Sequence, residues 1–369
     1  MIRSALMTFA LVLATQTANA TEGERLQSSA GALEVTRVVM DLDEPWAFGF
    51  LPGGGLLITE RGGRLLHIAA NGQRQSVGGL PRIARGGQGG LLDLLIPRDF
   101  AETRQIVLTY ARRQGSGAGT AVAVATLSGD NARLEDTRTI FETEPGDRGG
   151  RHFGSRVVEG PDGFLYVTIG DRGDDASAQD LGTQNGSVIR IGRTGGVPTR
   201  NPFIDTPGAQ PEIWSYGHRN PQGATLDPAG NLWVVEHGAR GGDEINQVRR
   251  GANYGWPVIS YGRHYSGLRI GEGSSKPGME QPDHFWDPSI APSGMMIYSG
   301  ALWPEWRGDF FVGSLKFGYL SRLEAGSFAE EEIEGDSTAR LRDVREGPDG
   351  AIWFLSVGNG ALYRMRPAQ

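Results

Sequence analysis

The chain has 369 residues, no cysteine, and 43 acidic against 36 basic side chains, which gives a formal net charge of −7. The lack of cysteine excludes disulfides, thiolate metal sites and cysteine nucleophiles, and the acidic balance argues against a nucleic-acid partner. With 57 glycines, 20 prolines and no sustained helical periodicity after residue 20, the composition predicts an all-β protein.

The first twenty residues are typical of a cleavable secretory signal. Arg3 precedes an apolar run from Ala5 to Ala14, and the segment ends in the small residues Ala18 and Ala20. The alternative, a membrane anchor, would need about 20 apolar residues, more than this run supplies. We therefore expect cleavage near Ala20, a mature net charge of −8 (−7 minus the +1 of Arg3), no membrane span, and a periplasmic or secreted protein.

One pattern recurs along the rest of the chain. Each copy has a short apolar run, a turn built from Pro, Asp or Gly, and a second strand rich in β-branched and aromatic residues. Such a turn suits a tight antiparallel connection, because proline presets φ at one corner and glycine accepts a positive φ at the other. The six copies span residues 46–68, 91–111, 156–173, 223–248, 295–323 and 342–365.

Six such repeats predict a six-bladed β-propeller with four-stranded antiparallel blades and long functional loops. A β-sandwich, the alternative, would not explain why the same turn recurs. The propeller would form one catalytic domain over residues 21–369, without a long exposed sheet edge if its first and last blades close on each other. The cluster RRQGSG at 112–117 is expected to be a loop, and we assign it no function.

Polar insertions interrupt the repeats, and chemistry is expected there. Glycines flank Gln88, so that its side chain could stand close to a ligand. His152 precedes one strand of the third repeat and Asp171 follows the next strand, so an antiparallel hairpin would bring both to one rim. A neighbouring carboxylate makes a histidine a better general base and fixes its tautomer. The alternative is a surface histidine with a chance acidic neighbour.

Two further insertions carry charge. Asp243 and Glu244 in the glycine-rich segment 235–257 could wrap a Ca²⁺ ion with carboxylates and carbonyls, although the alternating acids of an EF-hand are missing and a solvated acidic turn is the alternative. A cationic pocket is predicted from side chains in three other segments. Because like charges in one cavity repel, such a pocket calls for a polyanionic small molecule. Its members are Arg219, Lys316, Arg340 and Arg342.

These segments resemble a known family. In order along the chain they read GGQGGLL, RHFGSRVVEGPDG with IGDRG, SYGHRNPQG, EHGARGGDEIN with NYGWP, WDPSIAPSG, SLK and RLRDV. They are similar to motifs of the soluble quinoprotein sugar dehydrogenases, six-bladed propellers that bind pyrroloquinoline quinone (PQQ), and specifically of the periplasmic aldose sugar dehydrogenases. The resemblance runs from about Pro45 to Met365.

The resemblance implies an oxidation of aldose sugars, both mono- and oligosaccharides, at the anomeric carbon C1. His152 would take the proton of the anomeric hydroxyl and Asp171 would orient it, while hydride passes to C5 of the quinone and leaves a lactone. The same resemblance implies substrate contacts by Gln88, Asp171 and Trp286. It implies cofactor contacts by Gln88, Arg219, Asn220, Tyr265, Lys316, Arg340 and Arg342, the last three on carboxylates, and a catalytic role for Arg219 on the growing charge.

The resemblance also implies Ca²⁺. One ion would lie against the quinone, held by the main-chain carbonyls of Gly238 and Ala239, although the more familiar glucose-oxidising members have proline at the second position. Glu244 and the Tyr254 carbonyl match a further, structural Ca²⁺ site. Sugar specificity, the electron acceptor and the choice between monomer and homodimer are not predicted.

Two other classes of function remain open at this point. A Ca²⁺-dependent propeller lactonase would need side-chain acids and amides converging on a central metal, and it would have no use for four cations. A non-catalytic binding propeller would leave the pairing of His152 with Asp171 without purpose.

Overall fold

The computed structural model describes residues 23–143 and 149–369, so the predicted signal segment lies outside the described residues. Six antiparallel sheets are formed. The first comprises β3 (Pro45–Phe50), β4 (Leu56–Glu60), β5 (Arg64–Ile68) and β6 (Arg74–Ser76). The second has β7 (Leu91–Leu95), β8 (Gln105–Gln114), β9 (Gly117–Leu127) and β10 (Leu134–Glu142), and the third has β11 (Val157–Glu159), β12 (Leu165–Ile169), β13 (Ser187–Ile191) and β14 (Ile213–Tyr216).

The fourth sheet comprises β15 (Pro221–Leu226), β16 (Leu232–Glu236), β17 (Asp243–Val248) and β18 (His284–Trp286). The fifth has β19 (Pro292–Ile297), β20 (Phe310–Ser314), β21 (Tyr319–Leu323) and β22 (Glu330–Glu334). The sixth has β23 (Leu341–Glu346), β24 (Ile352–Ser356), β25 (Ala361–Pro367), β2 (Gly31–Val39) and β1 (Glu24–Ser28). Helical turns are limited to α1 (Phe100–Thr103), η1 (Asp175–Gln179), η2 (Pro304–Trp306) and η3 (Asp336–Thr338) among the described residues.

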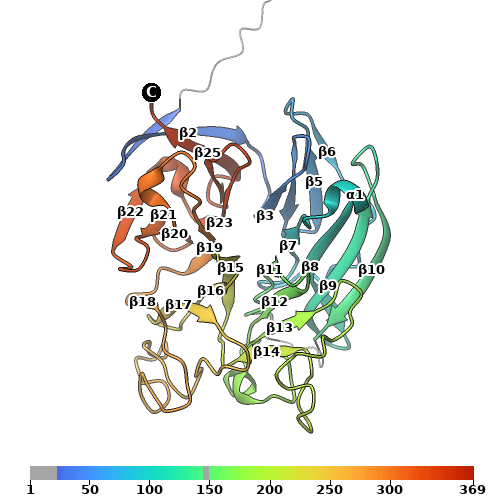
Figure 1. The fold of residues 1–369 in the computed structure, drawn as a ribbon, viewed down its shortest axis with the longest axis vertical. Coiled ribbons are helices and arrows are strands. Elements are labelled where there is room, and N and C mark those ends of the chain that lie inside the picture. The colour runs from blue at the N-terminus through green and yellow to red at the C-terminus, as the bar shows by residue number, and fades with distance from the viewer. Residues whose placement is uncertain (1–22, 144–148) are drawn as a thin grey trace, which may run out of the picture.

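The sheets are the blades of a propeller. Figure 1 looks along its axis and shows the first strand of each blade, β3, β7, β11, β15, β19 and β23, around the centre, with the last strands outermost. The predicted six-bladed all-β architecture is confirmed, and each predicted repeat contains the first strands of one blade. Within the described residues no helix is long and apolar enough to cross a membrane.

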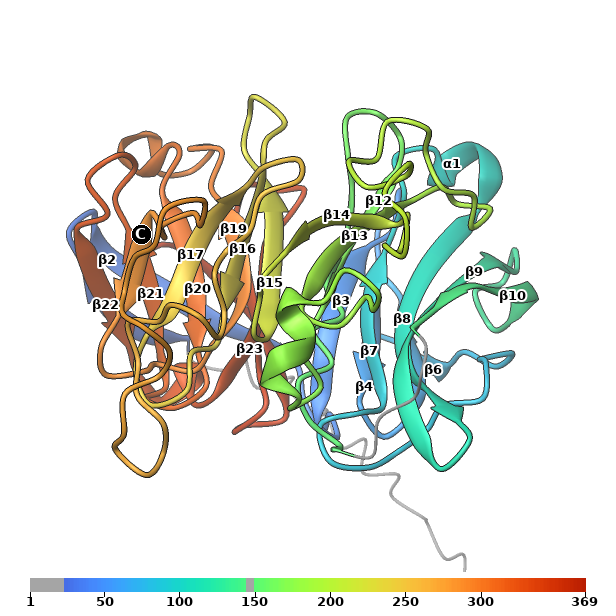
Figure 2. The ribbon, with the colours of Figure 1, turned by 90° about the horizontal axis from the view of Figure 1, so that it is seen from below.

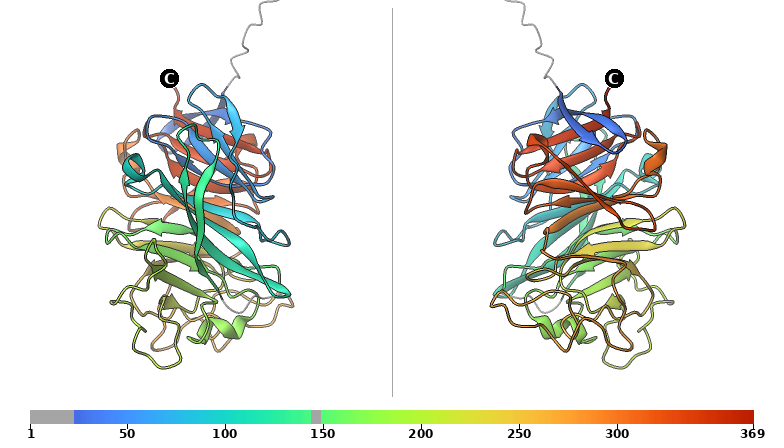
Figure 3. Two further views of the ribbon diagram at one scale, coloured as in Figure 1. Left: turned by 90° about the vertical axis from the view of Figure 1, so that its right-hand side faces the viewer. Right: turned by 90° about the vertical axis from the view of Figure 1, so that its left-hand side faces the viewer.

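The two ends of the chain close the ring. β2 pairs antiparallel with β25, with Val35 opposite Met365, and both views of Figure 3 show the N-terminal strands lying against the C-terminal ones. β1 then pairs with β2, so the sixth blade has five strands where four were predicted. Closure leaves no open first or last blade.

Apolar clusters hold neighbouring blades together. Leu57 and Leu91 share a cluster between the first and second blades, Phe311 and Phe354 one between the fifth and sixth, and Phe48 packs with the Leu355 cluster where the sixth blade meets the first. Each fully buried side chain of this size contributes roughly 1.5–3 kcal/mol. The inner strands are therefore buried on both faces, which explains why the repeats read as near-continuous apolar runs.

The prediction of a loop at residues 112–117 is wrong for most of that segment. β8 continues to Gln114 and β9 begins at Gly117, with Arg112 opposite Gly119 and Arg113 opposite Ala118. Only Gly115 and Ser116 connect the strands. The charged side chains do not break the strand, because small residues face them across the hairpin and Arg112 pairs with Glu142.

Strand alternation decides where the functional loops lie. Because successive strands are antiparallel, the loops that enter the first strand of a blade and those that join its second and third strands meet at one end of the propeller. Figure 2 shows the strands of the blades from the side, with loops gathered at both ends. Gln88, His152 and Arg219 precede first strands, whereas Asp171 and Gly238 follow second strands, so all five belong to the same end.

Candidate active site

A cavity of about 910 Å³ opens at this end of the propeller axis. Most of the predicted site residues line it, and they come from loops and strand starts of the second, fourth, fifth and sixth blades. Those residues are Gln88, Asn220, Gly238, Ala239, Tyr265, Lys316, Arg340 and Arg342.

His152 and Asp171 are in contact, as their spacing predicted. Nδ1 of His152 lies 2.6 Å from Oδ1 of Asp171, and the His152 side chain is only 10% exposed. Since the carboxylate accepts, Nδ1 carries the proton, and Nε2 makes no hydrogen bond with any described residue. The second carboxylate oxygen accepts from Nε1 of Trp256 at 2.8 Å. This arrangement fixes one tautomer and leaves one ring nitrogen able to accept a proton.

The carboxyl of Asp171 is held ionised. Burial alone would raise its pKa, but the hydrogen bond and charge of His152, the main-chain N–H of Gly173 and the charge of Arg219 together lower the pKa below its usual value. Asp171 is 0% exposed and both oxygens are occupied by protein donors. Both carboxylate oxygens of Asp171 thus have protein partners, His152 among them, and the substrate contact expected of Asp171 stays a prediction.

The backbone around His152 is unusual. His152 has a φ of 52° and Ser155 one of 85°, values that residues with a Cβ seldom adopt. Gln88 helps to hold the loop, since the His152 N–H donates to its Oε1 at 2.7 Å and its own N–H donates to the carbonyl of Gly150 at 2.8 Å. Strained backbone of this kind concentrates at functional sites.

The cavity is strongly cationic. We call the cationic side chains that line it the cation cluster, namely Arg61, Arg240, Lys316, Arg340 and Arg342. Two carboxylates, Glu44 and Asp287, lie in the same lining, and Glu44 already pairs with Arg61 at 2.5 Å. Within the described residues the cluster thus exceeds its local counter-charges, although the whole chain is acidic, so an anion would be stabilised here.

The crowding of positive charges in the cavity affects the pKa of Arg342. Burial, followed by the charges of Arg156, Arg340 and Arg61, lowers the pKa of Arg342 to about 9. Its side chain stays protonated at neutral pH and donates to Oε1 of Gln222 at 2.9 Å. A bound carboxylate would relieve the repulsion between these guanidinium groups.

Arg219 lies behind the cavity rather than in its lining. Its Nη1 donates to the carbonyl of Gly238, and its guanidinium stacks over Trp256 with the central carbon 5.2 Å from the ring centroid. Its Nε is buried and makes no hydrogen bond with any described residue. The predicted cationic pocket therefore contains three of its four predicted members, with Arg219 beneath the loop that carries Gly238 and Ala239.

Glu244 and Tyr254 line a separate, very small cavity of about 10 Å³, together with Arg219 and Glu236. Burial and the nearby charge of Glu236 raise the pKa of Glu244 to about 8. Asn246 donates to both carboxylates, and its own Oδ1 is buried without a hydrogen bond to any described residue. The two desolvated carboxyls that line this cavity are oxygen donors of the kind that suits a hard cation.

Trp286 is not in the lining of the large cavity, and its substrate contact stays a prediction. Its indole packs in the apolar cluster between the fourth and fifth blades, and its Nε1 donates to Glu330 at 2.9 Å. It ends β18, the outermost strand of its blade. By contrast, Tyr265 lies in the cavity lining and is 76% exposed.

The sequence interpretation missed several cavity residues. Arg61 directly follows β4, His237 follows β16 and Val357 follows β24, the same place after a second strand that Asp171 occupies in its blade. A superposition of the repeats would have found them. Burial lowers the pKa of His237 to about 3, and its Nε2–H donates to the carbonyl of Pro292 at 2.6 Å, so this imidazole is neutral.

The glucose/sorbosone dehydrogenase family model matches residues 42–364. The chain belongs to this family. It is 43% identical over 336 residues to the aldose sugar dehydrogenase of Escherichia coli, covering 88% of this chain and 91% of that one.

Solved structures agree with this membership. The apo form of the soluble Escherichia coli aldose sugar dehydrogenase superposes with a TM-score of 0.87 at 39% identity, covering 91% of this chain and 100% of that chain. The PQQ-bound form of the Streptomyces coelicolor aldose sugar dehydrogenase does so with a TM-score of 0.76 at 26% identity, covering 90% and 98%.

Proposed function

We propose that this protein oxidises aldose sugars at the anomeric carbon to lactones, with PQQ as the electron-accepting cofactor. The observation that carries the proposal is the His152–Asp171 pair, whose neighbours Gln88 and Phe153 line a cavity that also holds the cation cluster. Family membership supports sugar oxidation, and PQQ is bound by a neighbour of the same family.

His152 acts as the general base in this proposal. Its Nδ1–H stays with Asp171 at 2.6 Å, and Nε2 takes the proton of the anomeric hydroxyl as C1 is oxidised. The ionised carboxylate of Asp171 stabilises the imidazolium that results. A positioned base of this kind contributes typically 10²- to 10⁴-fold in rate.

The cavity lining fits PQQ, because a small polycarboxylate would supply the anions that the cation cluster lacks. Lys316, Arg340 and Arg342 would hold its carboxylates, while Arg219 and Asn220 would face the quinone oxygens and Gln88 and Tyr265 the edge of the ring system. When bound, PQQ supplies the acceptor for the hydride of C1. Arg219 would need to turn its guanidinium from the Gly238 carbonyl toward that ligand.

The oxygen donors fit Ca²⁺ in two places. Gly238 and Ala239 offer main-chain carbonyls beside the cavity, and a Cβ on Gly238 would lie 2.3 Å from the carbonyl oxygens of both Gly241 and Gly242, so this loop brings oxygens close together. There the ion would act as a Lewis acid. Glu244 and the Tyr254 carbonyl would hold a second ion, which would neutralise the buried carboxyl pair. In this proposal, the Gly238 carbonyl gives up its hydrogen bond from Arg219 and binds the Ca²⁺ ion instead.

Export to the periplasm or outside the cell, with cleavage near Ala20, is part of the proposal and rests on the sequence of residues 1–20. The lactonase alternative is not favoured. Among residues 23–143 and 149–369 no three His, Asp or Glu side chains gather as a metal cage, which that reaction would need.

The test is reconstitution. The mature chain is mixed with PQQ and Ca²⁺, and reduction of the dye dichlorophenolindophenol is followed after addition of glucose, maltose and other aldoses. We expect sugar-dependent reduction that requires PQQ. A protein that binds PQQ but reduces no dye with any aldose would contradict the proposed function.

A further inference from the structure

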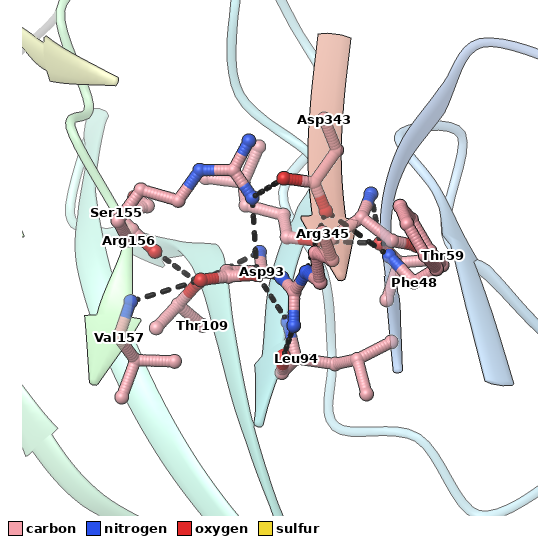
Figure 4. Close-up of polar contacts among 12 residues, drawn as sticks. Phe48, Thr59, Asp93, Leu94, Thr109, Ser155, Arg156, Val157, Asp343 and Arg345 are labelled. Carbon is pink, nitrogen blue, oxygen red and sulfur yellow. Dashed lines mark hydrogen bonds and ion pairs between the residues drawn. The ribbon is translucent and has the colours of Figure 1, made fainter. Parts of the chain in front are cut away.

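Four charged side chains meet beneath the cavity at the propeller centre, and Figure 4 shows them. We call Asp93, Arg156, Asp343 and Arg345 the central ion network. Nη1 of Arg156 lies 3.2 Å from Oδ1 of Asp93 and 3.0 Å from Oδ1 of Asp343. Arg345 bridges the same two carboxylates at 2.7 and 2.9 Å. Two acids are thus matched by two bases.

The network joins three blades. Asp93 belongs to β7, Arg156 directly precedes β11, and Asp343 and Arg345 belong to β23. Arg156 and both aspartates are each at most 3% exposed. Removing one partner of such a set leaves a buried charge unpaired and is strongly destabilising, so stability alone would explain the ion pairs.

Arg156 does more than pair with the aspartates. Its Nε donates to the carbonyl of Gln222 at 2.7 Å, and its Nη2 donates to the carbonyl of Arg342 at 2.9 Å. Its guanidinium carbon lies 4.2 Å from the ring centroid of Trp46. Gln222, Arg342 and Trp46 all line the cavity, and the side chains of the first two are bonded to each other at 2.9 Å.

Arg345 offers a natural comparison. It contacts the same two carboxylates, but its remaining contacts are the carbonyl of Leu94 at 3.4 Å and the ring of Phe48, 5.6 Å from the guanidinium carbon. Neither Leu94 nor Phe48 is in the cavity lining. The two arginines therefore share an ionic role and differ in whether they touch the cavity wall.

We propose that Arg156 is a positioning residue for the anion-binding wall of the cavity: by holding the main chain at Gln222 and Arg342, it fixes the guanidinium of Arg342 toward the ligand. This proposal rests on the function proposed above, in which that ligand is a carboxylate-bearing cofactor. Arg156 touches no ligand itself. A fork of several donors is required, because two carbonyls and two carboxylates are held at once.

The test compares Arg156→Met with Arg345→Met. Each variant, as the full mature chain with Ca²⁺, is titrated with PQQ by isothermal calorimetry, and its thermal midpoint is measured without cofactor. Both variants lose the same kind of ion pairs, so both midpoints fall. PQQ affinity should separate the two variants. Arg156→Met should bind PQQ more weakly than Arg345→Met by roughly tenfold or more, since hydrogen bonds to charged groups have effects of that order.

Arg156→Lys separates charge from geometry and serves where Arg156→Met does not fold. Lysine keeps one positive charge for the aspartates but cannot hold both carbonyls, so it should recover much of the thermal midpoint while PQQ affinity stays low. Equal PQQ affinity in the Arg156 and Arg345 variants, or full recovery by lysine, would overturn the positioning role.

A failure of the proposed function would look different. If the wild-type protein does not bind PQQ at all, that function fails, and the same variants are compared with citrate, a redox-inactive tricarboxylate. Weaker citrate binding in Arg156→Met alone would keep the positioning role, and equal binding would remove it.

Discussion

The pairing of His152 with Asp171 shows how far residue spacing can lead. Their positions at the two ends of one hairpin predicted that they would meet, and they lie 2.6 Å apart. The sequence could not show that Trp256, 85 residues further along, would occupy the second oxygen of Asp171. That contact comes from another blade, and it leaves both oxygens of Asp171 with protein partners.

Replacing His152 tests the proposed base. His152→Ala should lower sugar turnover by about 10²- to 10⁴-fold and leave PQQ binding within a few-fold, because the cation cluster is untouched. Steady-state dye reduction and PQQ titration measure the two effects. His67→Ala is a suitable control, since His67 lies in β5 away from the cavity. A loss of PQQ binding in His152→Ala would assign His152 to cofactor positioning.

His237 gives the stability a defined pH dependence. Its pKa is lowered from 6.5 to about 3, first by burial, so between these values the unfolded chain binds more protons than the folded one. Stability should therefore fall as the pH drops below about 6.5. At pH 5 the wild-type protein should lose roughly 1–2 kcal/mol more than His237→Gln, relative to pH 7.5. Urea unfolding at both pH values checks this, and parallel losses would contradict it.

At the scale of elements, the recurrence of short apolar runs separated by turns of Pro, Asp or Gly located all six blades, because residues of these types favour turns between strands. RRQGSG was judged from residue type, but it ends β8 and begins β9 of one long hairpin, whose pairing outweighs the charged and small residues at its tip. Arg61 was missed because its local sequence contains no recognisable motif. Only its position directly after β4, the second strand of its blade, indicates that it belongs to the cavity lining.

The loop that carries Gly238 and strand β17 should respond to Ca²⁺. Millimolar Ca²⁺ should raise the thermal midpoint by roughly 3–5 °C, measured against EGTA. Glu244→Gln should lose part of this increase. Without Ca²⁺, the same variant should be at least as stable as the wild type at pH 9, because the pKa of Glu244 is about 8 and the wild type then carries a second buried charge beside Glu236. Identical Ca²⁺ responses would contradict the second site.

For the whole molecule, stability depends on closure of the ring by the N-terminal strands. Leu33 in β2 is fully buried and packs in the cluster between the fifth and sixth blades. Leu33→Ala should therefore lower the free energy of unfolding by about 2–4 kcal/mol, whereas Val38→Ala, in the same strand but 44% exposed, should change it by about 0.5 kcal/mol or less. Equal effects in denaturant unfolding would contradict closure through β2.

The charge of the molecule is arranged to suit one kind of ligand. A chain with net charge −7 gathers five cationic side chains around one cavity, and a local field of this sign favours small anions over other solutes. The composition alone predicted an acidic protein, and only the positions of Lys316, Arg340 and Arg342 after or at the start of strands indicated a cationic centre.

Anaerobic addition of an aldose to the PQQ-loaded protein tests the central claim most directly, because no dye or acceptor protein intervenes. The absorbance of the bound cofactor should change on mixing to that of its reduced form, at a rate that rises with sugar concentration and falls at least 10²-fold in His152→Ala. An unchanged cofactor spectrum with every aldose, in protein shown to bind PQQ, would contradict the assignment of this propeller as a PQQ-dependent sugar dehydrogenase.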